Sequence, residues 1–261
     1  MLPSTLYLVP LAVAMVGFLA LWPLSVLRKD ASLVDAWWGP GFFAQAVCAA
    51  LLIGTVGAHQ ILLLGLIGLW SARLGFVLIR RRVREGHEDP RYTSLRDAWD
   101  PGFWWKSLFV VFLLQSVIQW AIMLGPITAF LAGSTDLGFV AMIGSALGVL
   151  GLWIETRSDH ELDVFKRDAP TGALCETGLR AHVRHPNYSG EILFWIGVGL
   201  VVSEISIFAG LISPVLITVL LTKVSGAPML DERLLASRPG YAAYRDRVPG
   251  FIPRLRKLSI A

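Results

Sequence analysis

The chain has 261 residues, of which 55% are hydrophobic and only 16% charged, and its mean hydropathy is +0.62. A soluble domain would carry about 25% charged residues, so the composition excludes an ordinary soluble protein and indicates an integral membrane protein. The net charge of +4 is explained by membrane topology and anionic lipid. The basic residues form no aromatic-interleaved block typical of nucleic-acid surfaces, so we expect no nucleic-acid partner.

Seven uncharged or nearly uncharged apolar runs are long enough to cross a bilayer as helices, which takes about 20 residues each. In chain order they cover about 6–27, 33–56, 60–80, 105–131, 137–156, 188–204 and 206–222. No Lys or Arg precedes the first run, so we expect a true span and not a cleaved signal peptide. The fold class is therefore all-α: a polytopic membrane protein with seven transmembrane helices, forming a single transmembrane domain over residues 1–261.

Three glycines in the fifth run, Gly144, Gly148 and Gly151, predict a surface where another helix approaches closely, because small residues let helix backbones meet in lipid. The two cysteines, Cys48 and Cys175, lie in an apolar run and a polar loop. They support neither a disulfide framework nor a cysteine metal site.

The basic residues predict the orientation in the membrane. Lys and Arg follow spans 1, 3, 5 and 7, whereas the short loops after spans 2, 4 and 6 contain neither. By the positive-inside rule, the N-terminus is outside and the C-terminus cytoplasmic. The loops at about 81–104 and 157–187 and the tail at about 223–261 then share the cytoplasmic face, where we expect the cofactor site, in what we expect to be a bacterial inner membrane.

Ionisable residues inside predicted spans are costly there and therefore functional candidates, and two of them stand out. Asp35 lies just inside the cytoplasmic end of span 2, and Arg73 about two turns from the cytoplasmic end of span 3. One interpretation is an ion pair between them. The other is that both line a polar cavity open to the cytoplasm.

The densest polar segment runs from Glu155 to Glu191, and Pro186 in it predicts the start of the sixth span. The free amides at that helix start, beside Arg184 and His185, could hold a phosphate or carboxylate. The alternative is a capped helix with an interfacial basic belt. The chain has only five histidines and shows no metal-ligand spacing, so we expect no metal site.

The tail carries Tyr241 and Tyr244, three residues apart and followed by arginines, which predicts an amphipathic cytoplasmic helix. Such a helix could anchor in the membrane interface or close over a nucleotide.

Several segments together resemble the bacterial branch of the steroid 5α-reductase family: LVDAWWG, SDHEL, RHPNYSGE and the terminal DERLL with PGYAAYRDRVPGFIPR. The resemblance implies a seven-span enzyme that binds NADPH from the cytoplasm and reduces the 4,5 double bond of 3-oxo-4-ene steroids. RHPNY with the acidic and tyrosine-containing tail also resembles the isoprenylcysteine methyltransferase branch, which uses S-adenosylmethionine. LVDAWWG, WSAR and the SD pair fit the reductases better.

The resemblance implies roles for individual residues. The family's catalytic tyrosine falls at Trp70 here, so Tyr92, Tyr188 or Asp35 alone would have to replace it. We take Asp35 and Tyr92 as the catalytic candidates. The candidate substrate-binding residues are Asp35, Trp37, Trp38 and Trp70, and the candidate cofactor-binding residues are Arg73, Asp159, Lys166, Arg184, His185, Asn187, Tyr188, Glu191, Tyr241 and Tyr244.

The implied reaction transfers a hydride to the β carbon of an enone, and the developing enolate oxygen needs a hydrogen-bond donor in a dry site. Because burial disfavours a charged carboxylate, a protonated Asp35 could donate. The expected partners are a steroid or another apolar enone and membrane lipid, with no obligatory protein partner. A non-catalytic transporter is the third possibility, but no pair of broken helices marks inverted repeats.

Overall fold

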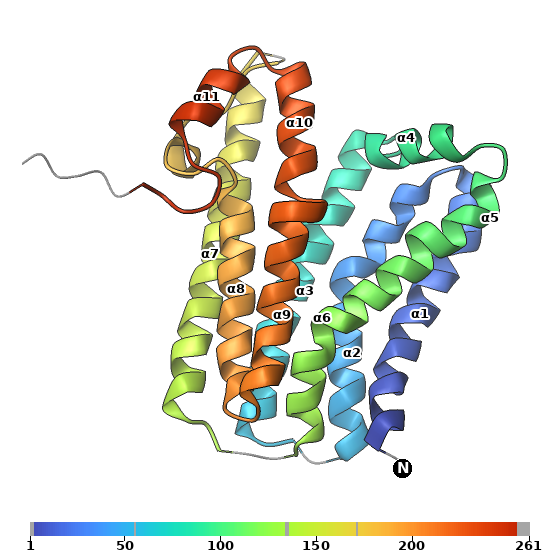
Figure 1. Ribbon diagram of the computed structural model, residues 1–261, viewed down its shortest axis with the longest axis vertical. Helices are drawn as coiled ribbons and strands as arrows, with labels where there is room; N and C mark the ends of the chain where they lie inside the picture. The colour runs from blue at the N-terminus through green and yellow to red at the C-terminus, as the bar shows by residue number, and fades with distance from the viewer. Residues whose placement is uncertain (1–2, 55, 134–135, 171, 255–261) are drawn as a thin grey trace, which may run out of the picture. The chain divides into compact units, whose positions relative to one another are not determined.

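The structure is a computed structural model that describes residues 3–54, 56–133, 136–170 and 172–254, and within them all regular elements are helices (Figure 1). The chain divides into two compact units. Unit 1 is Met1–Met142 with Val198–Ser213, and unit 2 is Ile143–Gly197 with Pro214–Ala261.

Six helical runs are long and apolar enough to cross a membrane, which supports an integral membrane protein. They are Ser4–Arg28, Ala31–Ile53, Ala58–Arg84, Phe103–Leu131, Phe139–Asp168 and Ile207–Ser237. The remaining predicted span, 188–204, coincides with helix α8 (Pro186–Ser203), which is not among the six. The physical reason is that its 18 residues begin with the polar stretch PNYSGE, so its apolar part is short.

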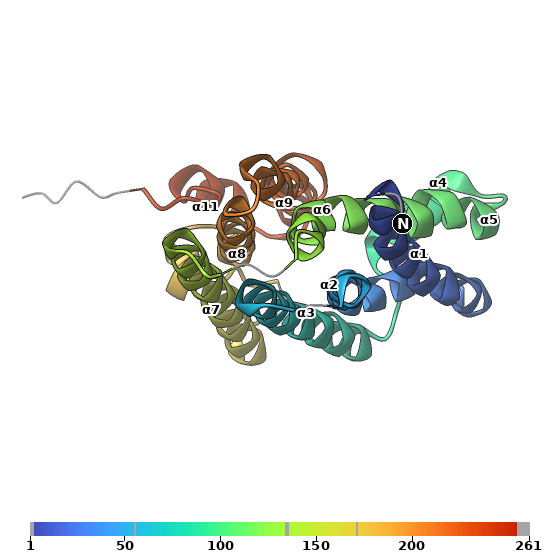
Figure 2. The same cartoon turned by 90° about the horizontal axis from the view of Figure 1, so that it is seen from below.

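Unit 1 is built around helix α2, which packs against α1, α3 and α6 (Figure 2). The elements of this unit are α1 (Pro3–Arg28), the 3₁₀ helix η1 (Ala31–Trp37), α2 (Trp38–Ile53), α3 (Ala58–Glu85), α4 (Pro90–Trp99), α5 (Phe103–Ser107), the π-helical segment η2 (Leu108–Leu113) and α6 (Leu114–Leu131). A core cluster that includes Phe18, Val34, Tyr92 and Phe112 joins these helices, and the indoles of the neighbouring Trp37 and Trp38 pack against it.

The predicted loop 81–104 is largely helical. Helix α3 continues to Glu85, and α4 begins at Pro90. Pro90 suits the first turn because it lacks the amide hydrogen that this position leaves unused. The preceding Asp89 caps the helix, since its side chain accepts a hydrogen bond from the Arg91 amide. Helix α4 thereby brings Arg91 and Tyr92 into contact with Asp35 of η1.

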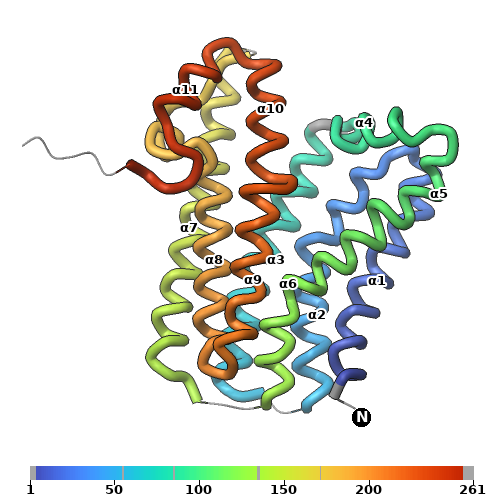
Figure 3. Tube along the Cα trace, viewed as in Figure 1, coloured from blue at the N-terminus to red at the C-terminus, as the bar shows by residue number. Residues whose placement is uncertain are grey.

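Unit 2 contains most of α7 (Phe139–Asp168), which extends beyond the predicted span end at 156. It also contains the 3₁₀ helix η3 (Gly178–Ala181), most of α8, part of α9 (Ile207–Val219), the π-helical segment η4 (Leu220–Val224), α10 (Ala227–Ser237) and α11 (Tyr241–Arg247). Figure 3 shows the trace continuing from α9 through η4 into α10, so the last candidate span is one long helical run.

Glycines bring α7 and α8 into backbone contact inside unit 2. A Cβ atom at Gly190 would lie 2.7 Å from the carbonyl oxygen of Gly151, and one at Gly197 would lie 2.4 Å from that of Gly144 and 2.5 Å from the amide nitrogen of Gly148. The predicted close-contact surface of the fifth span is therefore confirmed, and its partner is α8.

Candidate functional site

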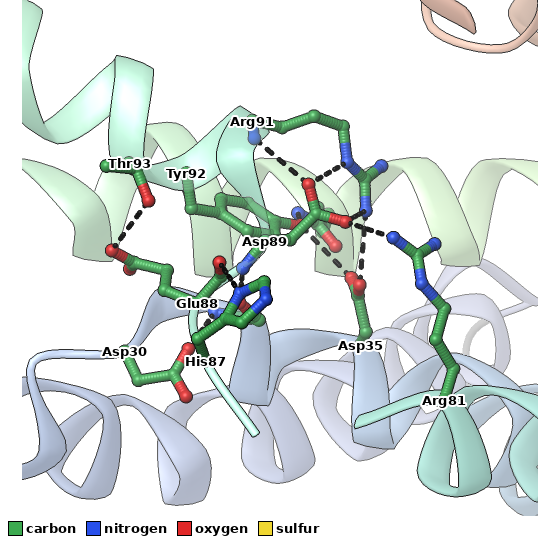
Figure 4. A network of polar contacts seen from close by, with 11 residues as sticks. Asp30, Asp35, Arg81, His87, Glu88, Asp89, Arg91, Tyr92 and Thr93 are labelled. Atoms are coloured by element: carbon green, nitrogen blue, oxygen red, sulfur yellow. Dashed lines mark hydrogen bonds and ion pairs between the residues drawn. The ribbon is translucent and has the colours of Figure 1, made fainter. Parts of the chain in front are cut away.

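The structure brings the two catalytic candidates together in unit 1. The Tyr92 hydroxyl donates a hydrogen bond to Asp35 Oδ1 at 3.0 Å, although the two residues are 57 positions apart in the chain (Figure 4). Arg91 Nη2 lies 3.3 Å from Asp35 Oδ2. Asp35 thus pairs with Arg91 and Tyr92, residues that the sequence placed beyond span 3.

Asp89 holds Arg91 in this position. Its carboxylate accepts hydrogen bonds from Arg91 Nε at 3.0 Å and Nη2 at 3.1 Å, and from Arg81 Nη2 at 2.8 Å (Figure 4). Burial opposes ionisation of Asp89, but the hydrogen bonds from Arg91 and the charge of Arg81 outweigh it and hold the pKa of Asp89 below its usual value. Arg91 therefore bridges two carboxylates from different elements.

Tyr92 is buried, with 8% of its surface exposed. Burial, reinforced by the negative charge of Asp35, raises the pKa of Tyr92 well above its ordinary value. The hydroxyl consequently keeps its proton at any physiological pH and remains a hydrogen-bond donor.

A half-buried glutamine and an indole complete the surroundings of Tyr92. Gln115 Nε2 donates to the Tyr92 hydroxyl oxygen at 3.2 Å, and Trp38 Nε1 donates to Gln115 Oε1. One turn further along α6, Gln119 donates to the backbone oxygens of Trp37 and Trp38 at 3.2 and 3.0 Å and accepts from Gln45 at 3.0 Å. Of the aromatic residues predicted to form a substrate wall, Trp37 and Trp38 therefore belong to a hydrogen-bonded framework.

The segment before α4 is fastened to η1. Glu88 accepts from the Ala31 amide and from Arg96 Nη2, each at 2.7 Å, and the Asp89 amide donates to Ser32 Oγ at 2.7 Å. These bonds fix the start of α4, and with it Tyr92, against η1.

In unit 2, Asp231 gathers three donors. It accepts from His185 Nε2 at 2.8 Å, from Arg184 Nη2 at 3.1 Å and from the Tyr241 hydroxyl. Burial lowers the pKa of His185 although the negative charge of Asp231 opposes this shift. The histidine is consequently neutral near pH 7, and it stacks on Tyr188 with ring centroids 5.6 Å apart.

The tail folds back onto the start of α8. The backbone amides of Arg184 and His185 donate to the carbonyl oxygens of Pro249 and Gly250 at 2.9 and 3.0 Å. The Tyr244 hydroxyl donates to the Arg180 carbonyl oxygen at 2.6 Å, and burial raises the pKa of Tyr244 to about 12.

Three features of this region were predicted, with different outcomes. The predicted start of the sixth helix at Pro186 is confirmed by α8, and the predicted tail helix by α11. Tyr241 and Tyr244 are 1% and 2% exposed, so both are buried in unit 2 and neither presents its ring to a membrane interface.

The remaining candidates lie as follows. Trp70 and Arg73 are in α3, which belongs to unit 1, and Trp70 packs edge-to-face on Phe42 with centroids 5.1 Å apart. Asp159 and Lys166 are on the part of α7 beyond its predicted end, and Asn187, Tyr188 and Glu191 occupy the first turns of α8.

Two of these positions have polar groups to spare for a ligand. Arg184 Nε is buried and has no acceptor within the described part of the chain, and the half-buried Asn187 side chain likewise makes no hydrogen bond to a described residue. A cationic side chain and an amide beside the start of a helix have the donor chemistry that nucleotide phosphates require.

Several residues of these networks were not predicted, among them Asp89, Arg91, Gln115 and Asp231. Two signals could have found some of them. The Asp-Pro pair at 89–90 is a helix-start pattern, and an amide at Gln115 within a predicted span is costly unless it has a partner. Among the described residues, no group of three or more His, Cys, Asp or Glu side chains is placed to hold a metal ion.

The fold and the two polar clusters define an all-helical membrane protein with buried ionisable groups next to aromatic side chains. The chain belongs to the family described as Protein of unknown function (DUF1295), whose model matches residues 21–248. That family is part of the steroid 5-alpha reductase-like superfamily. The predicted resemblance is therefore confirmed at the level of the superfamily.

One relative is "Uncharacterized protein C594.04c" of Schizosaccharomyces pombe. It is 26% identical over 270 aligned positions, which cover 90% of this chain and 76% of the relative. No solved structure matches the chain.

Proposed function

We propose that the protein is an NADPH-dependent reductase of the 4,5 double bond of 3-oxo-4-ene steroids or of a similar enone lipid. The observation that carries the proposal is the 3.0 Å hydrogen bond between Tyr92 and Asp35. It places a buried tyrosine hydroxyl, which is protonated at physiological pH before the reaction, beside a carboxyl group. A developing enolate oxygen needs such a donor.

In the proposed reaction the Tyr92 hydroxyl turns from Asp35 to the carbonyl oxygen of the enone and donates a hydrogen bond to it. NADPH, when bound, supplies the hydride that adds to the β carbon. As negative charge develops on the carbonyl oxygen, the Tyr92 hydroxyl donates its hydrogen bond and then its proton to that oxygen, which gives an enol. The enol returns this proton to the Tyr92 oxygen as its α carbon takes a proton from water, and the product is the saturated ketone. Asp35 orients the Tyr92 hydroxyl, and Arg91 balances the charge of Asp35. Trp37 and Trp38 supply flat apolar surface for a rigid substrate. Trp70 is 1% exposed and supports Trp38 through Phe42, on which both indoles pack.

The residues of unit 2 suit the phosphates of the cofactor. Asn187 and Arg184 Nε offer donors that the described chain does not use, and Lys166 adds positive charge. Asp231 positions Arg184 and His185 through the bonds given above, and Tyr241 and Tyr244 hold the tail against this region. We assign Arg73, Asp159, Tyr188 and Glu191 to the cofactor as well, on the strength of the resemblance.

We also propose seven membrane spans, with the N-terminus outside and the C-terminus cytoplasmic, in a bacterial inner membrane with the active site facing the cytoplasm. The six apolar helical runs support this arrangement, with α8 as the seventh span. Apart from Arg73 within the third span, Lys and Arg follow alternate spans and are absent from the short loops after spans 2, 4 and 6, which supports the orientation.

The proposal is tested by following NADPH absorbance with protein purified in detergent and a panel of apolar enones, including a 3-oxo-4-ene steroid. We expect NADPH loss that depends on the enone, with a product saturated at the former double bond. Methyl transfer from S-adenosylmethionine to a lipid or prenylated thiol, without NADPH oxidation by any enone, would contradict the proposal and favour the methyltransferase branch.

A further inference from the structure

Gln115 belongs to none of the sequence motifs described above. It lies on α6, within a candidate span, and its side chain connects an indole on α2 to Tyr92 on α4. An amide in a membrane span is costly unless its polar groups have partners. The half-buried Gln115 uses its oxygen and its nitrogen in the two contacts.

The chemistry of the two partners fixes which way the amide points. The Trp38 indole nitrogen can only donate, so it must face Gln115 Oε1. Gln115 Nε2 then faces Tyr92 and donates to the phenol oxygen at 3.2 Å. Because this oxygen accepts from Gln115, the remaining Tyr92 hydrogen is directed to Asp35 Oδ1 at 3.0 Å.

We propose that Gln115, oriented by Trp38, is a positioning residue for the reaction: it sets the direction of the Tyr92 hydroxyl and stabilises the phenolate oxygen after proton transfer. This inference rests on the proposed function. When the Tyr92 O–H bond breaks, its proton moves to the enolate oxygen and the electron pair stays on the phenol oxygen. The hydrogen bond from Gln115 Nε2 to the Tyr92 oxygen then has an anionic acceptor. Such a bond is roughly twice as strong as one to a neutral acceptor.

Four charged groups lie around the hydrogen bonds that link Trp38, Gln115 and Tyr92. They are Asp35 from η1, Asp89 and Arg91 at the start of α4, and Arg81 from α3. Asp35 opposes charge on Tyr92, whereas Arg91 favours it. Gln115 is the neutral donor, so its contribution does not change with pH in the native chain. A substitution that makes position 115 titratable therefore gives a distinctive signature.

The test compares Gln115→Leu and Gln115→Glu with Gln45→Leu as the matched control. Gln45 is a fully buried amide in the same unit, but it donates to Gly41 and Gln119 and does not touch Tyr92. We expect Gln115→Leu to lower kcat by about 10- to 100-fold, with KM changed less than about threefold. Gln45→Leu should retain the pH–rate profile of the wild-type protein.

Gln115→Glu separates positioning from packing. The introduced side chain has the size of glutamine and can still accept from Trp38. Ionised, it repels the Tyr92 oxygen, but protonated it can donate to that oxygen. We therefore expect its kcat, relative to the wild-type value, to rise at least about tenfold between pH 8 and pH 5.5. Equal losses in both variants at every pH, or the same pH response in Gln45→Leu, would overturn the inference.

A second measurement needs no enzyme activity and therefore separates failure of this inference from failure of the proposed function. A fluorinated tyrosine is placed at position 92, and its ionisation is followed by absorbance with Gln115 or with Gln115→Leu. We expect the substitution to raise the midpoint by about one unit, as loss of about 1.4 kcal/mol of phenolate stabilisation requires. An unchanged midpoint would refute the role of Gln115 whatever the protein catalyses.

Discussion

At the scale of single residues, the proposed enone reduction depends on the Asp35–Tyr92 pair. We expect Tyr92→Phe to lower kcat for enone reduction by about 10²- to 10³-fold, because it removes the proton donor to the enolate oxygen. Asp35→Ala should abolish turnover. NADPH affinity, measured by direct titration, should be unchanged in both variants because the assigned cofactor residues are elsewhere. Tyr7→Phe is the matched control, since that hydroxyl pairs with Thr128 and not with Asp35. Full turnover without the Tyr92 hydroxyl would remove it from the mechanism.

A second prediction at this scale concerns His185 and pH. Burial lowers the folded-state pKa of His185, so the folded protein resists protonation that the unfolded chain accepts below about pH 6.5. The free energy of unfolding should therefore fall as the pH drops below that value, until His185 itself is protonated in the folded state. Above about pH 6.5 this contribution should not vary.

The measurement is the thermal-unfolding midpoint in detergent between pH 7.5 and 5. His185→Gln can still donate to Asp231 but does not titrate, so its midpoint should fall less on acidification than that of the wild-type protein. His160→Gln, which changes an exposed histidine of α7, should behave as the wild-type protein does. Parallel curves for the wild-type protein and His185→Gln would contradict the assignment.

The catalytic candidates show how far residue-level prediction reaches. Asp35 was identified because a carboxyl group in an apolar run is costly. Tyr92 was identified only as one replacement for the tyrosine that the family has at Trp70. Their contact depends on α4 folding back over η1, and that is decided by bonds such as Glu88 to the Ala31 amide, which no pattern in the sequence specifies. Arg91 and Gln115 were missed for the same reason.

At the scale of the elements, hydropathy located the apolar helices but not their polar continuations. Helix α7 extends to Asp168 and α4 begins at Pro90, both in segments expected to be loops. These parts are polar, so they contribute nothing to an apolar run. Their helical character comes instead from caps such as Asp89 and from contacts that form only in the folded chain.

The contact between α7 and α8 gives a prediction at this scale. A leucine at Gly197 would place side-chain atoms where the α7 backbone lies, since even a Cβ there would be 2.4 Å from the Gly144 carbonyl oxygen. Such overpacking costs about 1–3 kcal/mol or more, so Gly197→Leu should lower the unfolding midpoint by several degrees. Gly65→Leu on α3, where a Cβ would meet no atom within 4 Å, is the control. Equal midpoints for the two variants would show that α7 and α8 do not pack through glycine.

At the scale of the whole molecule, the charge distribution predicts the membrane orientation. The test introduces single cysteines at Ala132, after the fourth predicted span, and at Ser237, in the tail, in a protein whose Cys48 and Cys175 are replaced by serine. The two positions should differ when intact cells are labelled with a membrane-impermeant maleimide. We expect label at position 132 and none at position 237 until the cells are opened. The proposed topology places three spans between these positions, so they lie on opposite sides of the membrane. Labelling of both positions in intact cells would therefore contradict the cytoplasmic tail.

A thermal-shift titration of the detergent-purified protein, comparing NADPH with S-adenosylmethionine, shows which of the two cofactors the protein binds. A ligand that binds the folded state alone raises its apparent stability, by about 2.7 kcal/mol at a hundredfold excess over Kd. For an NADPH-dependent reductase we expect a concentration-dependent rise of the unfolding midpoint with NADPH and none with S-adenosylmethionine. A rise with S-adenosylmethionine alone would contradict the reductase and favour a membrane methyltransferase.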